Sequence, residues 1–394
     1  MLKINKNYQK IKKNYIFTEI SNKKDKYLKE NQKAKIIDLG IGDVTLPLGK
    51  NLVKVMEKAL AEQTHRSTFK GYPPENGYDF LKDQIIKYYK RRNVELNRKD
   101  VFVSNGACCD VTNILDLFNK NTTVIANPTY PAYFDSNFLQ GNSIILESAS
   151  VQNDFVLNPK NLNKKSYLIY LCSPNNPTGT VFSKNQLKQW VDFALKTKSI
   201  IIFDCAYESF IDDVKFPHFI YEIPGAKKCA VEIASFSKMA GFTNLRCSWT
   251  VVPTELKIGN QSLNNMWERR QCTKFNGVPY LIQKGAEYAL SEEGFKECKK
   301  NIDYYKKNLK ILLKNLKEVG IETYSSQHTP YVWFKCPNKY TSWEFFDILV
   351  TQCQIVGIPG VGFGSAGEGF FRFSAFGRRK DIIEACKRLK KAHL

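Results

Sequence analysis

The chain has 394 residues, and its 59 lysines and arginines against 38 aspartates and glutamates give a net charge of +21. Hydrophobic residues make up 43% and aromatic residues 13%, a composition that indicates a folded globular protein and excludes extensive disorder. No apolar run reaches the length of about 20 residues that a membrane-spanning helix needs. We therefore expect no membrane partner.

The basic charge and the cysteines bear on partners and location. A large positive charge is also found in proteins that bind nucleic acids. Here the lysines occur in short clusters along the whole chain, so we expect solvated surface charges and no nucleic-acid partner; a basic nucleic-acid-binding protein is the distant alternative. The eleven cysteines have no CxxC spacing and indicate reduced thiols without a metal site. Because MLKINKNYQKIKKNYIF has no apolar signal segment, we expect a cytoplasmic location.

The chain order predicts three parts. Residues 1–50 form an N-terminal arm and part of a small domain, residues 51–290 a large domain that binds the ligand, and residues 291–394 the C-terminal small domain. Within the arm, YIFTEISNKKDKYLKEN predicts irregular structure or a short helix. Residues 51–63 and 80–93 carry apolar side chains at three- and four-residue spacing, which predicts amphipathic helices.

Six compact apolar runs follow. They lie at 101–105, 122–128, 166–174, 199–207, 229–238 and 247–253. Their interiors are nearly continuously apolar, which is typical of strands buried on both faces of a mostly parallel sheet. Helical patterns such as residues 184–197 lie between several of them. The large domain is therefore predicted to be a doubly wound α/β domain.

The pattern changes after residue 290. A long helical stretch at 295–320 leads to strands at 331–336 and 369–377, with helices at 342–353 and 379–392. These elements predict a second, smaller α/β domain.

Polar groups follow five of the apolar runs. They are Ser104-Asn105-Gly106-Ala107, Tyr130, Asn176 in NNPTG, Asp204 with Tyr207, and Lys238. Ligands of open α/β sheets bind beyond the carboxyl ends of the strands. We therefore expect these groups to meet at one crevice.

Taken singly, these groups have ordinary explanations as well as functional ones. The turn before Ala107 could present backbone N–H groups to an anion or could simply join strand and helix. Tyr130 could be a packed core ring, and Asn176 could cap its own turn. Asp204 and Lys238 are harder to explain structurally, because a buried charge is unfavourable unless it meets a partner.

One ligand would satisfy the whole set. Ser235, Ser237 and Arg246 surround Lys238 as a second group suited to an anion. Pyridoxal 5′-phosphate has four groups that match this set. They are a phosphate, a flat ring, a ring nitrogen that a carboxylate can stabilise, and a carbonyl that reacts with a lysine. Asp204 would keep the ring nitrogen protonated, and Lys238 would form a Schiff base and later move the substrate Cα proton.

The motifs SPNNPTGT, FDCAY and SFSKMAGFTNLR stand in an order and spacing that resembles the fold type I pyridoxal-phosphate aminotransferases over nearly the full chain. Seven further segments resemble the members of this family that act on LL-2,6-diaminopimelate: NYIFTEI, LGIGDVTLP, GYPPENGYDFLK, SNGACCD, NPTYPAYFDS, KFNG and FRFSAFGRR. The resemblance implies ping-pong exchange between LL-2,6-diaminopimelate plus 2-oxoglutarate and tetrahydrodipicolinate plus glutamate. That reaction serves lysine and cell-wall precursor synthesis.

The resemblance also implies roles by position. Lys238, Asp204 and Tyr130 would be catalytic, with the Tyr130 ring stacked on the cofactor. The cofactor contacts would be Ala107, Cys108, Tyr130, Asn176, Asp204, Tyr207, Ser235, Ser237, Lys238 and Arg246, with Tyr72 from a partner subunit. The substrate contacts would be Arg372 at the α-carboxylate with Gly42 and Asn176 nearby, Tyr15 closing over the site, and Glu75 and Asn276 from the partner subunit. The active unit would therefore be a homodimer with shared sites.

The chain departs from this family at several positions. Cys108 stands where the family has a lysine, Pro73 replaces a loop glycine, and Asn244 and Ser248 replace glycines after the Schiff-base lysine. We expect cofactor binding to survive, because Asp204 and the backbone amides remain. A related aminotransferase with a different amino donor, such as lysine, is the alternative.

Overall fold

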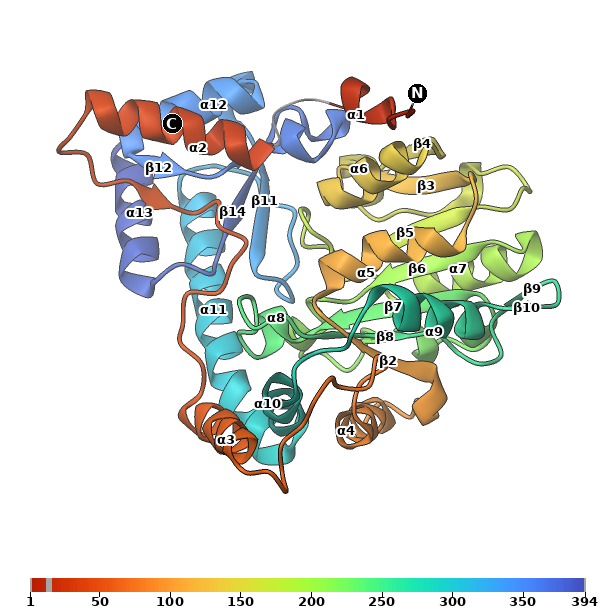
Figure 1. Cartoon of the computed structure of the whole chain (residues 1–394). Helices are drawn as coiled ribbons and strands as arrows, with labels where there is room; N and C mark the ends of the chain where they lie inside the picture. The colour runs from red at the N-terminus through yellow and green to blue at the C-terminus, as the bar shows by residue number, and fades with distance from the viewer. Residues whose placement is uncertain (1, 12–15, 393–394) are drawn as a thin grey trace.

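The computed structural model describes residues 2–11 and 16–392, and a seven-stranded sheet forms its centre (Figure 1). In spatial order the strands are β2 (Val101–Ser104), β8 (Ser248–Val251), β7 (Ala230–Ser235), β6 (Ile200–Asp204), β5 (Leu168–Cys172), β3 (Thr122–Asn127) and β4 (Ser143–Ser148). The strands from β7 to β4 are parallel, while β8 runs antiparallel to both of its neighbours. The predicted fold class is confirmed.

Each of the six apolar runs contains a strand, because each buries both faces. Along β6, Ile200 and Ile202 belong to one core cluster, while Ile201 and Phe203 belong to the other. Strand β4 was not predicted. It is the half-exposed edge of the sheet, and its short apolar segment is flanked by polar residues that hide the strand pattern.

Helices cover both faces of this sheet. Helices α5 (Ala107–Asn113) and α9 (Leu263–Lys274) pack on one face, and α7 (Lys184–Thr197) packs on the other (Figure 1). The remaining helices are α1 (Asn7–Lys10), α2 (Ile16–Glu30), α3 (Lys50–Ala61), α4 (Asp79–Lys90), α6 (Pro131–Gln140), α8 (Phe236–Met239), α10 (Tyr280–Leu290), α11 (Glu292–Glu318), α12 (Ser342–Ile348) and α13 (Arg379–Lys391). The predicted helices near 51–63, 80–93 and 184–197 are confirmed.

The second group of strands forms the small α/β part. Strand β14 (Phe370–Ser374) pairs antiparallel with β11 (Tyr331–Lys335) and with β13 (Ile358–Pro359). Strand β1 (Ile37–Asp38) pairs in parallel with β12 (Ile355–Val356).

The N-terminal segment lies with these C-terminal elements. Helix α2 runs beside α12 (Figure 1), and Lys23 pairs with Asp347 at 2.9 Å. This contact fits the predicted division of the small domain between residues 1–50 and 291–394, whose limits stay a prediction.

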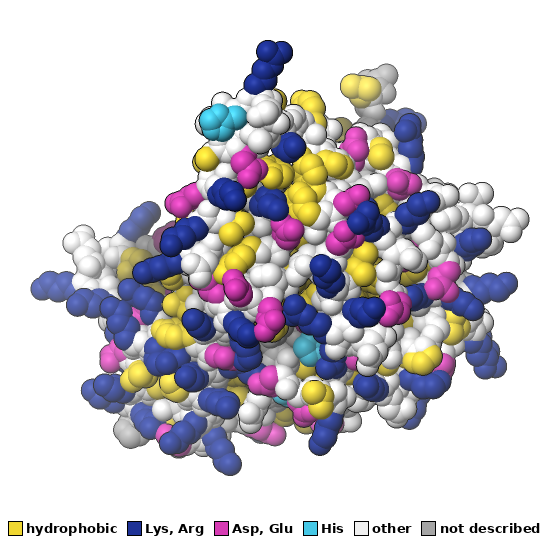
Figure 2. Space-filling model, turned by 90° about the horizontal axis from the view of Figure 1, so that it is seen from below, with side chains coloured by type: hydrophobic (Ala, Val, Ile, Leu, Met, Phe, Trp, Pro, Cys, Tyr) yellow, Lys and Arg dark blue, Asp and Glu magenta, His cyan; other side chains and the backbone are white. Residues whose placement is uncertain are grey.

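The surface carries dispersed charge. On the face seen in Figure 2, lysine and arginine side chains are spread over the surface with aspartates and glutamates between them. None of the helices in the described part of the chain has the length and apolar character needed to cross a membrane. That the chain has no nucleic-acid partner stays a prediction.

Candidate active site

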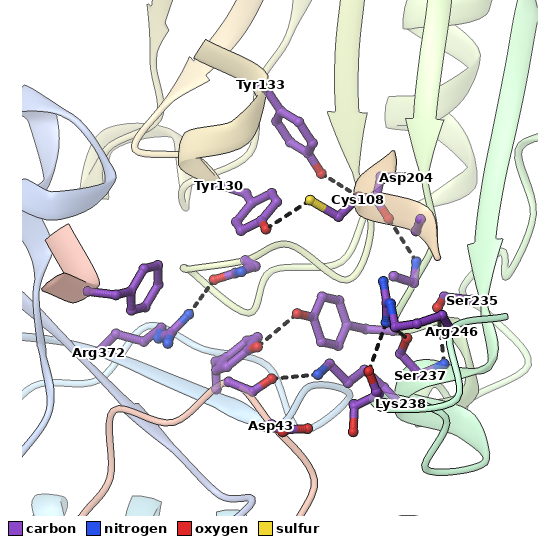
Figure 3. A pocket seen from close by; sticks show the side chains of 18 residues that line it. Asp43, Cys108, Tyr130, Tyr133, Asp204, Ser235, Ser237, Lys238, Arg246 and Arg372 are labelled. Atoms are coloured by element: carbon purple, nitrogen blue, oxygen red, sulfur yellow. Dashed lines mark hydrogen bonds between the residues drawn. The ribbon is translucent and has the colours of Figure 1, made fainter. Parts of the chain in front are cut away.

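A cavity of about 450 Å³ lies at the carboxyl ends of the parallel strands (Figure 3). Its volume is within the range of small-molecule sites, about 300–1,000 Å³. It brings together, from the predicted set, Gly42, Ala107, Cys108, Tyr130, Asn176, Asp204, Tyr207, Ser235, Ser237, Lys238, Arg246 and Arg372. The expected convergence of the strand ends on one crevice is therefore present.

Lys238 lies on the short helix α8, directly after the buried strand β7. Its Nζ donates a hydrogen bond of 2.5 Å to the backbone oxygen of Gly42. Burial lowers the pKa of Lys238 to about 8; the nearby carboxylate of Asp43 opposes this shift, and the Arg246 and Arg372 cations add to it. A large fraction of this amine is therefore neutral and nucleophilic in mildly alkaline solution.

Asp204 ends β6 and projects a buried carboxylate toward the cavity (Figure 3). The Tyr133 hydroxyl donates to its Oδ2 at 2.6 Å, and the Ala206 N–H donates to its Oδ1 at 2.9 Å. Burial raises the pKa of Asp204, and these two hydrogen bonds only partly offset that effect. Both donors are neutral, so a cationic N–H at the cavity side would stabilise this carboxylate further.

The groups after β7 form a small polar cup. Ser235 Oγ accepts the N–H of Ser237 at 3.0 Å. The Arg246 guanidinium donates to the Ser237 Oγ at 3.5 Å and to the Thr243 oxygen at 3.0 Å. A guanidinium beside two hydroxyls is suited to the oxygens of a phosphate.

Gly106, two residues after the end of β2, closes this cup. Its φ is +119°, and a Cβ atom there would lie 1.9 Å from Nη2 of Arg246. Any side chain would therefore displace the guanidinium. The N–H of Gly106 donates to Ser248 Oγ at 2.9 Å, and the chain then enters α5 at Ala107 and Cys108.

Arg372 on β14 forms the opposite wall and is only 1% exposed. Its Nη1 donates to Asn176 Oδ1 at 2.6 Å, and its Nη2 donates to the Gly40 oxygen at 2.9 Å. Its Nε is buried and has no hydrogen-bond partner among the described residues. Because burial lowers the pKa of Arg372 without an anion to offset it, a carboxylate is the ligand that this wall favours.

Several cavity residues were not predicted. Phe17, Asp43, Tyr133, Thr243 and Tyr331 also line it. Asp43 directly follows Gly42, and Tyr133 follows Tyr130 by one helical turn, so their positions next to predicted residues could have indicated them. Phe17 and Tyr331 come from distant parts of the chain and carry no such signal.

The comparisons agree with this geometry. The family model described as aminotransferase class I and II matches residues 34–389. The chain belongs to this aminotransferase family. Enzymes of the family work with pyridoxal 5′-phosphate, so membership implies that cofactor.

Three relatives resemble the aminotransferase over its whole length. LL-diaminopimelate aminotransferases of Prochlorococcus marinus and Methanosphaera stadtmanae are 45% and 46% identical to it over 407 and 408 aligned residues, with 99% of each chain covered. The solved L,L-diaminopimelate aminotransferase of Chlamydomonas reinhardtii has a TM-score of 0.94 and 37% identity, covering 100% of this chain and 99% of its own.

The donor set of the aminotransferase fits the implied cofactor. Three groups lie around one cavity. They are the Lys238 amine, whose pKa is lowered, the buried Asp204 carboxylate with its two neutral donors, and the polar cup at Arg246. Tyr130 also lines this cavity. These groups match the carbonyl, ring nitrogen, phosphate and ring face of pyridoxal phosphate.

The remaining predicted residues lie outside this cavity. Tyr72 is 88% exposed, and Glu75 and Asn276 are exposed as well. Their two loops lie side by side, since a Cβ atom on Gly277 would be 2.6 Å from the Pro74 oxygen. Tyr15 falls outside the described residues. The roles assigned to these four residues stay predictions.

The departures from the family pattern have structural counterparts. The Cys108 thiol is exposed and lies 3.5 Å from the Tyr130 hydroxyl. Ser248 supplies the acceptor for the Gly106 N–H, which a glycine could not do. The first change alters the chemistry of the cavity wall, whereas the second supports the turn that enters α5.

Proposed function

We propose that this aminotransferase exchanges an amino group between LL-2,6-diaminopimelate and 2-oxoglutarate, with tetrahydrodipicolinate, water and glutamate on the other side. The observation that carries the proposal is the arrangement of Lys238, Asp204 and Arg372 around one cavity. The substrate is inferred from the relatives that share 45% and 46% of their residues with it. The eleven cysteines are free thiols, which supports a cytoplasmic location.

We infer that pyridoxal phosphate occupies the cavity. Lys238 would hold it covalently, Asp204 would accept its ring N–H, and Tyr130 would stack on the ring. The other cofactor contacts would be Asn176 and Tyr207 at the ring hydroxyl oxygen, and Ala107, Cys108, Ser235, Ser237, Arg246 and the partner's Tyr72 at the phosphate. When bound, this group withdraws electrons from the bonds at the substrate Cα.

The protein side chains then bind, orient and move a proton. With the cofactor bound, Lys238 Nζ, neutral above a pKa of about 8, would accept the proton from the substrate Cα and would hold it as an ammonium beside the cofactor carbon that receives it. Asp204 holds its negative charge toward the ring nitrogen, with Tyr133 fixing the carboxylate. Arg372, which lines the cavity, would bind the α-carboxylate through its guanidinium, with Gly42 and Asn176 beside it.

We also propose a homodimer with shared sites. Tyr72, Glu75 and Asn276 are exposed and belong to two adjacent loops. None of the three lines the cavity of its own chain. A partner's copy of these loops would supply groups for the distal end of the substrate, and Tyr15 would close over it.

The first test of this function is optical. Purified protein given pyridoxal phosphate should show the absorbance of the lysine-bound cofactor, and LL-2,6-diaminopimelate alone should bleach that band in a single half-reaction. Lys238→Ala should abolish both signals. Lys306→Ala is the matched control, because Lys306 is also buried but donates to the Phe210 oxygen, outside the cavity.

A panel of amino donors separates the substrates. If LL-2,6-diaminopimelate leaves the band unchanged while lysine, aspartate or an aromatic amino acid bleaches it, the proposed donor is wrong. The exposed thiol of Cys108 favours the altered donor range as the alternative. Turnover retained in Lys238→Ala would remove the catalytic assignment itself.

Mixed dimers test the shared site. Chains carrying Lys238→Ala and chains carrying Glu75→Ala should each be inactive or strongly impaired alone. A symmetric dimer with shared sites should recover about a quarter of the sites when the two are mixed in equal amounts. No recovery after subunit exchange would argue against a partner role for Glu75.

A further inference from the structure

Tyr331 occupies the point where the two halves of the cavity meet. It begins β11, is 1% exposed, and pairs across the small sheet with Ser374. Its hydroxyl lies 2.8 Å from the hydroxyl of Tyr207, and its ring lies 4.3 Å from the guanidinium carbon of Arg372. One side chain therefore contacts a residue that follows strand β6 of the large sheet and a residue of strand β14 in the small sheet.

The ring of Tyr331 holds the plane of Arg372. The centre of the Phe363 ring lies 4.8 Å from the same guanidinium carbon, so two aromatic rings contact Arg372. A flat, weakly hydrated guanidinium is stabilised on aromatic faces. Two N–H groups of Arg372 donate to Asn176 and Gly40, so these hydrogen bonds and the two rings together restrain the plane of the guanidinium.

The hydroxyl of Tyr331 has a different function. A tyrosine hydroxyl has one proton to donate. When Tyr207 donates its proton to a ligand oxygen, Tyr331 becomes the donor to Tyr207. Such a chain strengthens each of its hydrogen bonds.

The segment around Gly42 covers the same hydroxyl. A Cβ atom on Gly42 would lie 3.1 Å from it, and the Gly42 oxygen accepts the hydrogen bond of Lys238. Tyr331 thus also abuts the segment that holds the reactive amine. Among the described residues, Tyr207 is the hydrogen-bond partner of this hydroxyl, so the hydroxyl acts within the site.

We propose that Tyr331 is a positioning residue that couples the two halves of the site. Its ring orients Arg372 toward a substrate carboxylate, and its hydroxyl donates to Tyr207 and strengthens the donation of Tyr207 to the cofactor ring oxygen. The inference rests on the proposed function, because it names the groups through which that site selects and orients its ligands.

Two substitutions separate the two functions. Tyr331→Phe keeps the ring and removes the hydroxyl, so the affinity for a dicarboxylate such as succinate, measured by calorimetry, should stay within about twofold. The weaker donation to the ring oxygen should raise the pH midpoint of the cofactor chromophore by about half a unit. Tyr331→Leu should in addition weaken succinate binding by about tenfold.

Two further variants serve as controls for the Tyr331 substitutions. Phe363→Leu removes the other ring and leaves the hydroxyl, so it should weaken succinate binding without moving the chromophore midpoint, even if Tyr331→Leu does not fold. Tyr221→Phe removes a buried hydroxyl bonded to the Ala230 and Val251 oxygens, far from the described cavity lining, and should change neither quantity.

The outcomes are distinct. An unchanged midpoint in Tyr331→Phe overturns the function of the hydroxyl, and unchanged succinate affinity in both Tyr331→Leu and Phe363→Leu overturns that of the ring. Failure of the proposed function is seen in the wild type, as a missing cofactor band or no reaction with LL-2,6-diaminopimelate. Failure of the present inference is seen only in the variants of an active wild type.

Discussion

Two buried carboxylates on adjacent strands have opposite surroundings. Asp204 ends β6, and Glu232 lies in the middle of β7; the register pairs Asp204 with Ile233 and Phe203 with Glu232, so the two carboxylates point to opposite faces of the sheet. Burial raises the pKa of both, that of Glu232 to about 8. The pKa shifts alone therefore do not distinguish a carboxylate of the binding site from one of the core.

The difference lies in what each carboxylate faces. Glu232 accepts the Tyr89 hydroxyl and the Ile220 N–H, each at 2.5 Å, and is fully enclosed by the core. Asp204 accepts two neutral donors and also lines the cavity. A buried carboxylate therefore indicates a binding site only when it also borders a cavity; otherwise it can organise the core.

The largest effect is expected at the cavity. Asp204→Asn removes the negative charge that would keep the cofactor ring nitrogen protonated, so kcat should fall by about 10²- to 10⁴-fold while the cofactor stays covalently bound. Steady-state kinetics at saturating pyridoxal phosphate and the absorbance of the bound cofactor measure the two effects. A kcat of Asp204→Asn within about threefold of wild type would contradict the catalytic role that distinguishes Asp204 from Glu232.

Glu232 should affect stability and spare the site. Glu232→Ala leaves the Tyr89 hydroxyl and the Ile220 N–H without their acceptor in the core, so the free energy of unfolding should fall by about 2–4 kcal/mol. Urea denaturation measures the loss, and cofactor affinity at low temperature should remain that of the wild type. A variant of unchanged stability that has lost cofactor binding would contradict the structural role.

The sequence predicts one of these carboxylates and not the other for a physical reason. Asp204 interrupts the apolar pattern at a strand end, where ligands of open sheets bind. Glu232 is a single polar residue inside an apolar run, and its acceptor role depends on Tyr89, 143 residues away. Tyr331 was not predicted for the same reason, since its partner Tyr207 is 124 residues distant in the sequence.

The same reasoning explains how much of the fold could be predicted. Buried strands and amphipathic helices have local patterns, and these were predicted over most of the chain. The edge strand β4 has no such pattern. The proposed positions of Tyr72, Glu75 and Asn276 at a partner's site would depend on a surface between chains, which local patterns do not encode.

The pH dependence of stability sharpens the comparison. The folded-state pKa of Glu232 is raised to about 8 from 4.5, so its proton stabilises the fold fully below pH 4.5, and this stabilisation is lost as the pH rises toward 8. Between these values the unfolding free energy of the wild type should fall by up to about 1.4 kcal/mol per pH unit relative to Glu232→Gln. Urea denaturation at several pH values measures this difference.

Asp204 supplies the contrasting case for the same measurement. Its pKa is raised in the same direction, so the apoprotein should lose a further contribution as the pH rises. Cofactor binding should remove that contribution of Asp204, because a protonated ring nitrogen would favour the ionised carboxylate, and should leave that of Glu232 unchanged. Equal pH slopes for the apoprotein and the holoprotein would contradict this difference.

The smallest effect is expected at Ser248, a third buried polar group of the same sheet. Because β8 is antiparallel, its first residue lies at the same edge as the carboxyl ends of β2 and β7, opposite Ser104 and Ser235. A search for polar residues after the carboxyl ends of strands therefore does not find Ser248. Its hydroxyl accepts the Gly106 N–H and so holds the turn that packs on Arg246.

Ser248→Ala should leave that N–H without an acceptor and weaken pyridoxal phosphate binding by about three- to tenfold. Binding of pyridoxal, which has no phosphate, should change little, and this provides the control within one variant. Equal weakening for both ligands would mean that Ser248 acts on the whole cavity rather than on its phosphate end. Ser248 would then resemble Glu232, as an organiser of the core, more than Asp204.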